Sequence, residues 1–302
     1  MSYPSNTVVI LGLGLIGGSL ARALRDSGFS RRFIGYEHRE SSLRRGMELG
    51  VIDDFTLDLD EAIEQADIMV VCTPTLIASD MLRQILSRLA GRTGGPVITD
   101  VASVKGNILC AAQEAWEGRM PPQLVLGHPI AGSERSGVDA SNADLFVDHR
   151  VILTPVEGND PAAVALIRAM WESVGAEVVD MTVTAHDAVL AATSHLPHVL
   201  AYTLVDALAQ SDASDDIFRF AAGGFRDFTR IASSDPAMWR DIAIANRVAL
   251  LDSIDTFSEH LGRLRNAVAT ANAEQLFDTF SRAKQARDEF SSILAQRSKQ
   301  KP

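Results

Sequence analysis

The sequence predicts an α/β fold, in which a doubly wound parallel sheet is followed by an all-helical dimerisation domain. Through residue 181, short apolar runs alternate with stretches of helical spacing, which is typical of parallel strands joined by crossover helices. A glycine-rich loop joins the first apolar run to the first helix. After residue 181, apolar residues recur at helical spacing and no strand is predicted. We therefore expect one domain at residues 1–181 and a second at residues 182–302.

Composition limits the partners of this chain. Its 302 residues are 46% hydrophobic and 22% charged, with a formal net charge of −11. These values are ordinary for a globular protein large enough for two domains, and the negative charge argues against nucleic acid and anionic membranes as partners. We find no secretory signal, no apolar run of membrane-spanning length and too few cysteines for a disulfide framework. We expect a cytoplasmic protein.

The first predicted strand, residues 7–11, leads into the motif G-L-G-L-I-G, which opens the first helix. A strand before and a helix after are the setting in which this motif binds a dinucleotide. Gly12 would allow the tight turn, Gly14 the close approach of a pyrophosphate, and Gly17 the close packing of helix on strand. The motif predicts a Rossmann-type domain. The residues expected to bind the cofactor here are Gly12, Gly14, Leu15, Ile16 and Gly17.

The second predicted strand, residues 32–36, ends at Glu37, twenty residues after Gly17. A carboxylate at this position binds the 2′-hydroxyl of the adenosine ribose. Glu37 therefore favours NAD over NADP, because a 2′-phosphate would face a like charge. Arg39 beside it would favour NADP, so NADP is the second choice of cofactor.

The later elements continue the alternation. We expect helices at residues 41–49, 59–65, 77–89, 106–116 and 161–173, and strands at residues 68–72, 96–99, 124–126, 150–154 and 177–179. Thr73 and Pro74 follow the strand at residues 68–72, at the edge where parallel sheets bind ligands. We therefore expect both to face the cofactor.

His128 is the candidate general base. It follows the apolar run at residues 124–126, and Pro129 prevents a helix from starting directly behind it. The carboxyl end of a parallel strand is where open sheets bind ligands, and histidine exchanges a proton near neutral pH. A histidine that only caps the loop through a backbone hydrogen bond is the alternative.

The motif S-H-L-P-H interrupts an apolar helical stretch at residues 188–209. Proline inside a helix costs about 3 kcal/mol, so some gain should compensate for Pro197. A kink that points His195 into a cleft would be one such gain. A packing kink with His195 and His198 placed by chance is the alternative.

A cationic segment follows two glycines at residues 223–224 and contains Arg226 and Arg230. In an acidic chain such a cluster predicts a site for carboxylate, which guanidinium binds in a bidentate manner. Asp227 either holds one arginine in place or forms a surface ion pair. We expect Phe225 and Phe228 to lie in the core.

Two long helices are predicted near the end of the chain, at residues 238–261 and around residues 276–294. Their apolar residues recur at helical spacing, which predicts helix packing. Because two such faces exceed what a small domain buries, part of this surface is expected to lie in a homodimer.

Five separated motifs, GLGLIGGS, TDVASVK, LGHPIAGSE, SHLPH and GGFRDFTRIASSDPAMW, occur in this order over nearly the whole chain. They resemble the prephenate/arogenate dehydrogenase family of tyrosine biosynthesis. The resemblance implies that the ring hydroxyl carbon of prephenate or arogenate is oxidised, that hydride passes to nicotinamide, and that the ring carboxylate leaves as carbon dioxide. It also implies a homodimer formed by the helical domain, and no metal, because aromatisation drives the reaction.

The resemblance implies residue roles as well. His128 would be the base, and Ser103 would hydrogen bond the substrate hydroxyl region and orient His128; an N-cap of the following helix is the alternative role for Ser103. The implied substrate-binding residues are His195, Arg230, Glu134, Arg226 and Trp239. No residue distinguishes prephenate from arogenate. We expect no regulatory domain after the helical domain, so inhibition by tyrosine would act at the active site.

Two other functions are considered. A β-hydroxy-acid dehydrogenase of similar architecture would use a lysine of the helical domain, but Lys284, Lys299 and Lys301 lie in no motif. A non-catalytic NAD-sensing protein would leave His128 and Arg230 without a shared purpose.

Overall fold

The structure is a computed structural model that describes residues 5–92, 94–132 and 135–299. The chain forms two compact units, residues 1–250 and residues 251–302. The first unit contains a six-stranded sheet of order β3-β2-β1-β4-β5-β6, in which every neighbouring pair is parallel. The predicted fold class is confirmed. The strands are β1 (Ser5–Leu11), β2 (Ser30–Tyr36), β3 (Asp54–Thr56), β4 (Ile68–Val71), β5 (Val97–Asp100) and β6 (Leu124–Val125).

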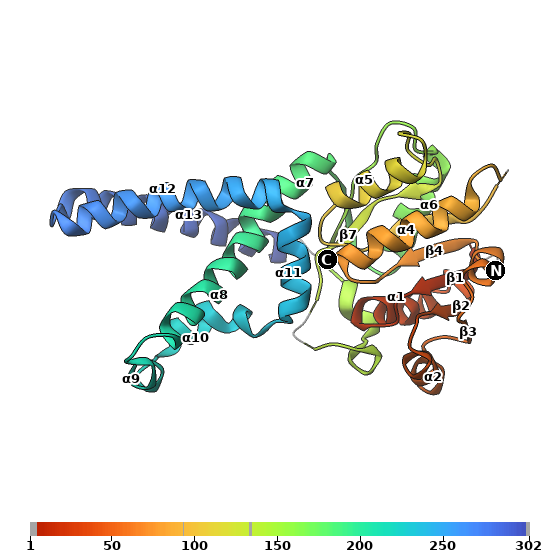
Figure 1. Cartoon of the computed structure of the whole chain (residues 1–302), viewed down its shortest axis with the longest axis horizontal. Coiled ribbons are helices and arrows are strands. Elements are labelled where there is room, and N and C mark those ends of the chain that lie inside the picture. Colours follow the sequence, from red (N-terminus) through yellow and green to blue (C-terminus); the bar gives the residue numbers. More distant parts are fainter. Residues whose placement is uncertain (1–4, 93, 133–134, 300–302) are drawn as a thin grey trace. The chain divides into compact units, whose positions relative to one another are not determined.

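Helices connect these strands and flank the sheet (Figure 1). The connecting helices are α1 (Leu15–Asp26), α2 (Glu40–Glu48), α3 (Leu59–Gln65), α4 (Thr75–Leu89) and α5 (Gly106–Ala115). A later helix, α6 (Pro161–Ser173), packs into the same core. The helices expected at residues 59–65 and 161–173 are confirmed at both ends. The side chains of Asp58 and Asp160 cap their N-termini. Strand β3 was not predicted, because its three residues are too few for an alternating pattern.

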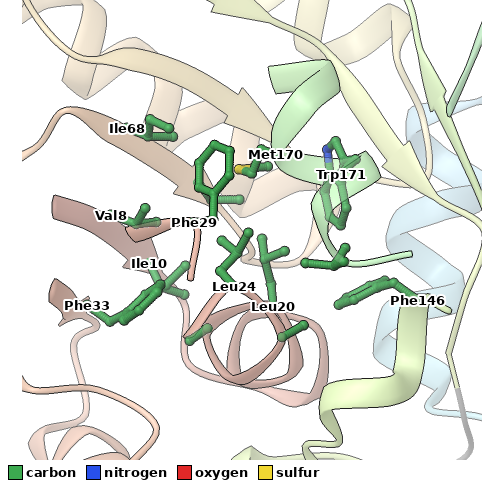
Figure 2. Packing of buried hydrophobic residues seen from close by; sticks show 14 of the residues in the cluster. Val8, Ile10, Leu20, Leu24, Phe29, Phe33, Ile68, Phe146, Met170 and Trp171 are labelled. Carbon is green, nitrogen blue, oxygen red and sulfur yellow. The ribbon is translucent and has the colours of Figure 1, made fainter. Parts of the chain in front are cut away.

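Both faces of the sheet are buried, which explains why residues 8–11 of β1 are all apolar. Successive strand residues point to opposite faces, so Val8 and Ile10 join one cluster while Val9 and Leu11 join the other. The first cluster packs α1 and α6 against the sheet (Figure 2). It ends at an edge-to-face pair, in which the ring centroids of Phe146 and Trp171 lie 5.2 Å apart.

A second sheet corrects one expectation. The strands β7 (Gly127–Pro129), β8 (Arg150–Leu153) and β9 (Glu177–Asp180) form a three-stranded sheet in which β7 and β8 are antiparallel. The strand predicted at residues 124–126 is β6, which ends at Val125. His128, which we expected to follow that strand in a loop, lies instead inside β7 of the second sheet. The reason is pairing. The amide of Thr154 donates to the Leu126 carbonyl at 3.0 Å and the amide of Ile130 donates to the Arg150 carbonyl at 2.7 Å, so β8 keeps the chain extended.

After β9 the described chain is helical, as predicted. The elements are α7 (Val183–Leu190), a π-helical turn (Ala191–His195), α8 (Leu196–Ala209), α9 (Ser214–Arg219), α10 (Gly223–Thr229), the 3₁₀ turn η4 (Arg230–Ser233) and α11 (Pro236–Ala245). Pro197 lies in the first turn of α8, where a missing N–H costs little. The π turn, which lies directly before it, is therefore the irregularity of this helical run, and a proline kink is not required.

The helical run Val183–Ala209 has 27 residues, and the mean hydropathy of its apolar window is 1.3. By length and composition alone, it could cross a membrane. The expectation that no stretch reaches that limit is corrected. His186 and His195 of this run are nevertheless fully buried in polar contacts with the rest of the first unit. We interpret the run as a helix of a folded domain.

The second unit contains α13 (Ala273–Lys299) and most of α12 (Arg247–Ala269) (Figure 1). The prediction of a single helix at residues 238–261 is wrong, because the helix is interrupted at Asn246, between α11 and α12. Much of the apolar stripe of α12 and α13 is exposed in the single chain. Exposed fractions of its side chains reach 52% at Leu261, 58% at Phe280 and 52% at Phe290.

Candidate active site

Three side chains form a continuous chain of hydrogen bonds at the centre of the site. His128 Nδ1 lies 2.9 Å from His186 Nε2, and His186 Nδ1 lies 2.8 Å from Asp187 Oδ1. His128 comes from β7, whereas His186 and Asp187 come from α7. The two rings meet edge to face, and His186 is fully buried. We call these three residues the relay.

Asp187 is anchored by the start of α5. The amides of Lys105 and Gly106 donate to its two carboxylate oxygens at 2.8 and 2.7 Å. A Cβ at residue 106 would lie 2.7 Å from one of these oxygens, so glycine permits the close approach. Burial raises the pKa of Asp187, but the hydrogen bonds from His186 and from the two amides lower it more, so that the pKa lies below its usual value.

A buried ion pair holds the strand that carries His128. The ammonium of Lys105 contacts the carboxylate of Asp100, and both side chains are fully buried. Lys105 Nζ also donates to the carbonyl of Gly127 at 2.5 Å, while the Gly127 amide donates to Asp100 at 3.3 Å. The pair therefore fixes both backbone groups of the residue before His128. Burial lowers the pKa of Lys105, against the charge and hydrogen bond of Asp100.

His128 is set up to be neutral. Its pKa lies well below the usual value for histidine, mainly because the ring is buried, and the charges of His186, Lys105 and His195 lower it further. At neutral pH the imidazole therefore keeps a lone pair that can accept a proton. The alternative, in which His128 caps a loop through a backbone hydrogen bond, is not what the structure shows. The partner of His128 Nδ1 is the His186 side chain.

His195 lies near the relay without belonging to it. Asn246 Nδ2 lies 3.0 Å from His195 Nδ1 and donates to the Asp187 carbonyl at 2.9 Å, which links His195 to the relay. Burial lowers the pKa of His195 to about 4. The structure places His195 at the end of the π turn, where it is only 1% exposed.

Trp239 and His198 form a second pair beside His195. Their rings stack with centroids 3.5 Å apart, and the ring centroid of His195 lies 6.1 Å from that of Trp239. Within the described part of the chain, the buried indole N–H of Trp239 has no hydrogen-bond partner. Burial lowers the pKa of His198, and the positive charge of Arg230 contributes, which places that guanidinium within electrostatic range of this pair.

The structure does not gather all of the predicted residues. Arg226 pairs with Asp227 at 3.2 Å as an exposed surface ion pair, which is the second of the two roles considered for Asp227. Phe228 is 50% exposed, so its expected place in the core is wrong, because α10 presents this side to solvent. Phe225 is half-buried against Phe218. Glu134 lies outside the described residues.

Ser103 is half-buried and precedes α5 by three residues. Among the described residues, its hydroxyl has no hydrogen-bond partner, and the side chain that caps the start of α5 is that of Asp187. Ser103 is therefore not the N-cap of this helix. The partner that orients the His128 ring is His186.

The glycine loop has the geometry expected of a dinucleotide site. Gly12 adopts φ of +96°, a conformation that favours glycine. A Cβ at Gly17 would lie 2.4 Å from the Gly12 carbonyl oxygen, whereas a Cβ at Gly14 would meet nothing within 4 Å. The space beside Gly14 and the start of α1, which no side chain caps, fit a pyrophosphate. Leu15 and Ile16 form the first turn of α1.

Glu37 lies beside this loop. Its carboxylate accepts the Leu13 amide at 3.2 Å and pairs with Arg39 at 3.2 Å. A Cβ at Gly12 would touch Thr73 at 3.0 Å, and the buried Thr73 hydroxyl has no partner among the described residues. Pro74, by contrast, is exposed and precedes α4. The loop therefore offers an acceptor for a ribose and an unused hydroxyl, which fit NAD.

The residues of this site that sequence reasoning missed include His186, Asp187 and Asn246. The adjacent His and Asp in an otherwise apolar helix, V-T-A-H-D-A-V-L, were the available signal. Lys284, the lysine that a β-hydroxy-acid dehydrogenase would need, is exposed and paired with Asp288. In the described parts of the chain no group of three or more His, Cys, Asp or Glu side chains is placed to hold a metal ion.

The comparisons agree on one family. Models described as the nucleotide-binding domain and the dimerization domain of prephenate dehydrogenase match residues 20–180 and residues 182–282. The chain is 37% identical to a prephenate dehydrogenase of Bacillus subtilis over 95% of this chain and 77% of that protein. It is 36% identical to a cyclohexadienyl dehydrogenase of Zymomonas mobilis over 93% of this chain and 94% of that protein.

Solved structures give the same answer. A crystal structure of prephenate dehydrogenase from A. aeolicus in complex with hydroxyphenyl propionate and NAD+ is 34% identical and superposes with a TM-score of 0.86. The match covers 96% of this chain and 99% of that chain. Two family models and relatives above 30% identity thus agree with the observed fold. The chain belongs to the prephenate dehydrogenase family.

Proposed function

We propose that the protein catalyses the NAD-dependent oxidative decarboxylation of prephenate to 4-hydroxyphenylpyruvate, of arogenate to tyrosine, or of both. The observation that carries this proposal is the buried imidazole of His128, whose pKa is lowered by burial, on a strand fixed by a buried ion pair. Such a base can take the proton of the ring hydroxyl while the hydride leaves the ring carbon that carries this hydroxyl. General-base catalysis of this kind typically contributes about 10²–10⁴ in rate.

The cofactor is proposed to be NAD. Gly12, Gly14 and Gly17 shape the loop, and the carboxylate of Glu37 would accept the ribose hydroxyls. Leu15, Ile16, Thr73 and Pro74 are proposed to complete the cofactor site. Bound NAD supplies the nicotinamide ring that accepts the hydride. Arg39 already pairs with Glu37, so the carboxylate remains the group that a 2′-phosphate would meet.

The substrate would be held by residues that follow the relay in the chain. Arg230, His195 and the free indole N–H of Trp239 are proposed to bind its carboxylates, with Ser103 near the ring hydroxyl. Arg230 would contribute most, since guanidinium binds carboxylate through two parallel hydrogen bonds. Glu134 and Arg226 stay as predictions from the sequence. When the hydride leaves, the O–H electron pair forms a ring carbonyl. The C–C bond to the ring carboxylate breaks, its electron pair completes the aromatic ring, and the phenolate oxygen takes the proton back from His128.

The decisive experiment follows the absorbance of reduced nicotinamide after the protein is mixed with NAD and prephenate, and separately with NAD and arogenate. We expect reduced cofactor with at least one of them, and kcat/KM for the two substrates will rank them. The same assay with NADP should give a lower kcat/KM, because of Glu37. Absence of reduced cofactor with both substrates would overturn the proposal, and reduction with a β-hydroxy acid would support the alternative function.

Tyrosine is proposed to inhibit by competing with the substrate. Its phenol resembles the aromatic product, so it would occupy the place of the substrate ring near His128. Initial rates at several tyrosine and prephenate concentrations should show an increase in KM with unchanged kcat. Inhibition that lowers kcat, or no inhibition, would contradict this part of the proposal.

We also propose a cytoplasmic homodimer, with the functional division between domains at residues 181 and 182. The apolar side chains exposed on α12 and α13, including Phe277 at 71%, support a surface covered by a second copy. Light scattering of the purified protein should give twice the chain mass of 32.6 kDa. A mass that stays at the monomer value at micromolar concentration would contradict the dimer.

A further inference from the structure

Two residues of the relay, His186 and Asp187, have no part in the function proposed above. His186 nevertheless contacts the base directly, and Asp187 contacts His186. Both residues come from α7. His186 lies 58 residues after His128 in the chain. His186 is fully buried and His128 is 8% exposed, so water competes little for their ring nitrogens. A buried polar chain of this kind is stable only when each donor meets an acceptor. The direction of its hydrogen bonds can therefore be derived.

The order of the atoms sets the tautomer of each ring. An ionised carboxylate only accepts hydrogen bonds, so His186 Nδ1 must carry the hydrogen that reaches Asp187 Oδ1. In a neutral His186 ring, Nε2 is then the acceptor, and His128 Nδ1 must donate to it. The hydrogen of neutral His128 thus lies on Nδ1. Its Nε2 keeps the lone pair.

We propose that His186 and Asp187 are positioning residues that hold His128 in the tautomer whose Nε2 accepts the substrate hydroxyl proton. In that step the substrate O–H bond breaks and an Nε2–H bond forms, while the hydride leaves to the nicotinamide. The His128 ring becomes an imidazolium, whose Nδ1 hydrogen is shared with His186. The carboxylate of Asp187, one ring away, stabilises this positive charge. This inference rests on the proposed function.

The surroundings show that the relay is held from several elements. Asp187 accepts two amides at the start of α5, and Asn246 donates to its carbonyl. His128 is held from the other side, because Lys105 binds the Gly127 carbonyl. If Asp187 served only to cap α5, the two amide hydrogen bonds to its carboxylate would be sufficient. The bond from His186 is additional, and it is the one that continues to the base.

Substitutions of His186 separate orientation from packing. In His186→Gln the amide oxygen can take the place of Nε2 and accept the His128 hydrogen, whereas His186→Phe fills the space without an acceptor. We expect kcat of His186→Phe to fall by about 10² or more, with KM within about threefold of wild type. His186→Gln should recover at least about tenfold of that loss. If His186 only filled space, His186→Phe would not lower kcat selectively, and kcat would not differ between the two variants.

A spectroscopic measurement tests the tautomer without any substrate. In full-length protein labelled with ¹⁵N-histidine, His128 Nδ1 should appear protonated and Nε2 unprotonated at neutral pH, with signals assigned by their loss in His128→Asn. In His186→Phe the preference for Nδ1–H should disappear. His149→Gln serves as the matched control, since the His149 side chain is exposed and its Nδ1 lies 3.0 Å from the Val147 carbonyl, outside the site.

Two outcomes would overturn the inference. One is a wild-type spectrum in which His128 carries its hydrogen on Nε2. The other is a His186→Phe variant whose kcat stays within about threefold of wild type. If wild-type protein reduces no NAD with prephenate or arogenate, the proposed function fails, while the spectrum still decides whether the relay sets the tautomer.

Discussion

The two sides of the proposed substrate site differ in how completely the single chain builds them. Around the relay, polar groups are buried and paired, and Lys105, Asp100 and His186 are all fully buried. The segment formed by α10 and η4, which we call the cationic segment, is exposed and carries a surface ion pair at Arg226. A buried network is rigid before substrate arrives, whereas exposed arginines gain most of their order on binding. We therefore expect kcat to depend on the relay side and KM on the cationic segment.

The largest effect should come from the base itself. His128→Asn removes the proton acceptor and should lower kcat by about 10²–10⁴, because the chemical step loses general-base catalysis. KM should stay within about threefold, since the cationic segment is intact. Steady-state nicotinamide absorbance measures both values, and the urea midpoint of the variant checks its folding. A variant with normal kcat and a raised KM would reverse the roles of the two sides.

The buried ion pair should matter more for stability than any exposed one. Lys105→Met leaves the carboxylate of Asp100 buried without its partner, so the free energy of unfolding should fall by about 3–5 kcal/mol. Arg150→Met is the matched control, because the pair of Arg150 with Glu177 is 37% and 57% exposed and should contribute at most about 1 kcal/mol. Urea unfolding measures both. Equal losses in the two variants would break the comparison.

The buried histidines should make the fold sensitive to acid. The pKa values of His128 and His195 are lowered in the folded protein, so at mildly acidic pH the unfolded chain binds more protons than the folded one. Stability is therefore fully present above the unfolded value and is lost as pH falls below it. For His195, between 6.5 unfolded and about 4 folded, the loss is at most about 3 kcal/mol.

Urea unfolding from pH 7.5 down to pH 5 measures this loss, and His195→Gln should reduce the slope of stability against pH. A free energy of unfolding that stays constant over this interval would show that the relay side is not closed to protons. The cationic segment should contribute nothing to the slope, because its arginines stay charged throughout.

The smallest effects should come from the exposed side. Arg230→Ala should raise KM by about 10–100-fold with kcat nearly unchanged, since one charge-assisted contact to a carboxylate is worth about 1.5–3 kcal/mol. Arg226→Ala should raise KM less, because its guanidinium is paired with Asp227 on the surface. Arg219→Ala, an exposed change at the end of α9, is the control. If Arg226→Ala exceeds Arg230→Ala, the assignment within this segment is reversed.

Much of the first unit could be predicted because its signals are local. The glycine loop, the carboxylate of Glu37 and the helices at residues 59–65 and 161–173 each depend on a short stretch of sequence. The course of the chain at His128 could not be predicted, because β7 exists through pairing with β8, more than twenty residues later. The break at Asn246 was missed for a similar reason. Its side chain is used by His195 and Asp187 rather than by its own helix.

By itself, the sequence determined the Rossmann-type sheet and the helical second half, and it predicted His128 as the base. These follow from hydrophobic period, glycine spacing and residue chemistry, which are properties of neighbouring residues. Only the tertiary structure decided that His128 meets His186 and Asp187, and that Lys105 and Asp100 hold its strand. The physical reason is that a buried polar group selects its partner by direction and distance, and residues far apart in the chain acquire both only after folding.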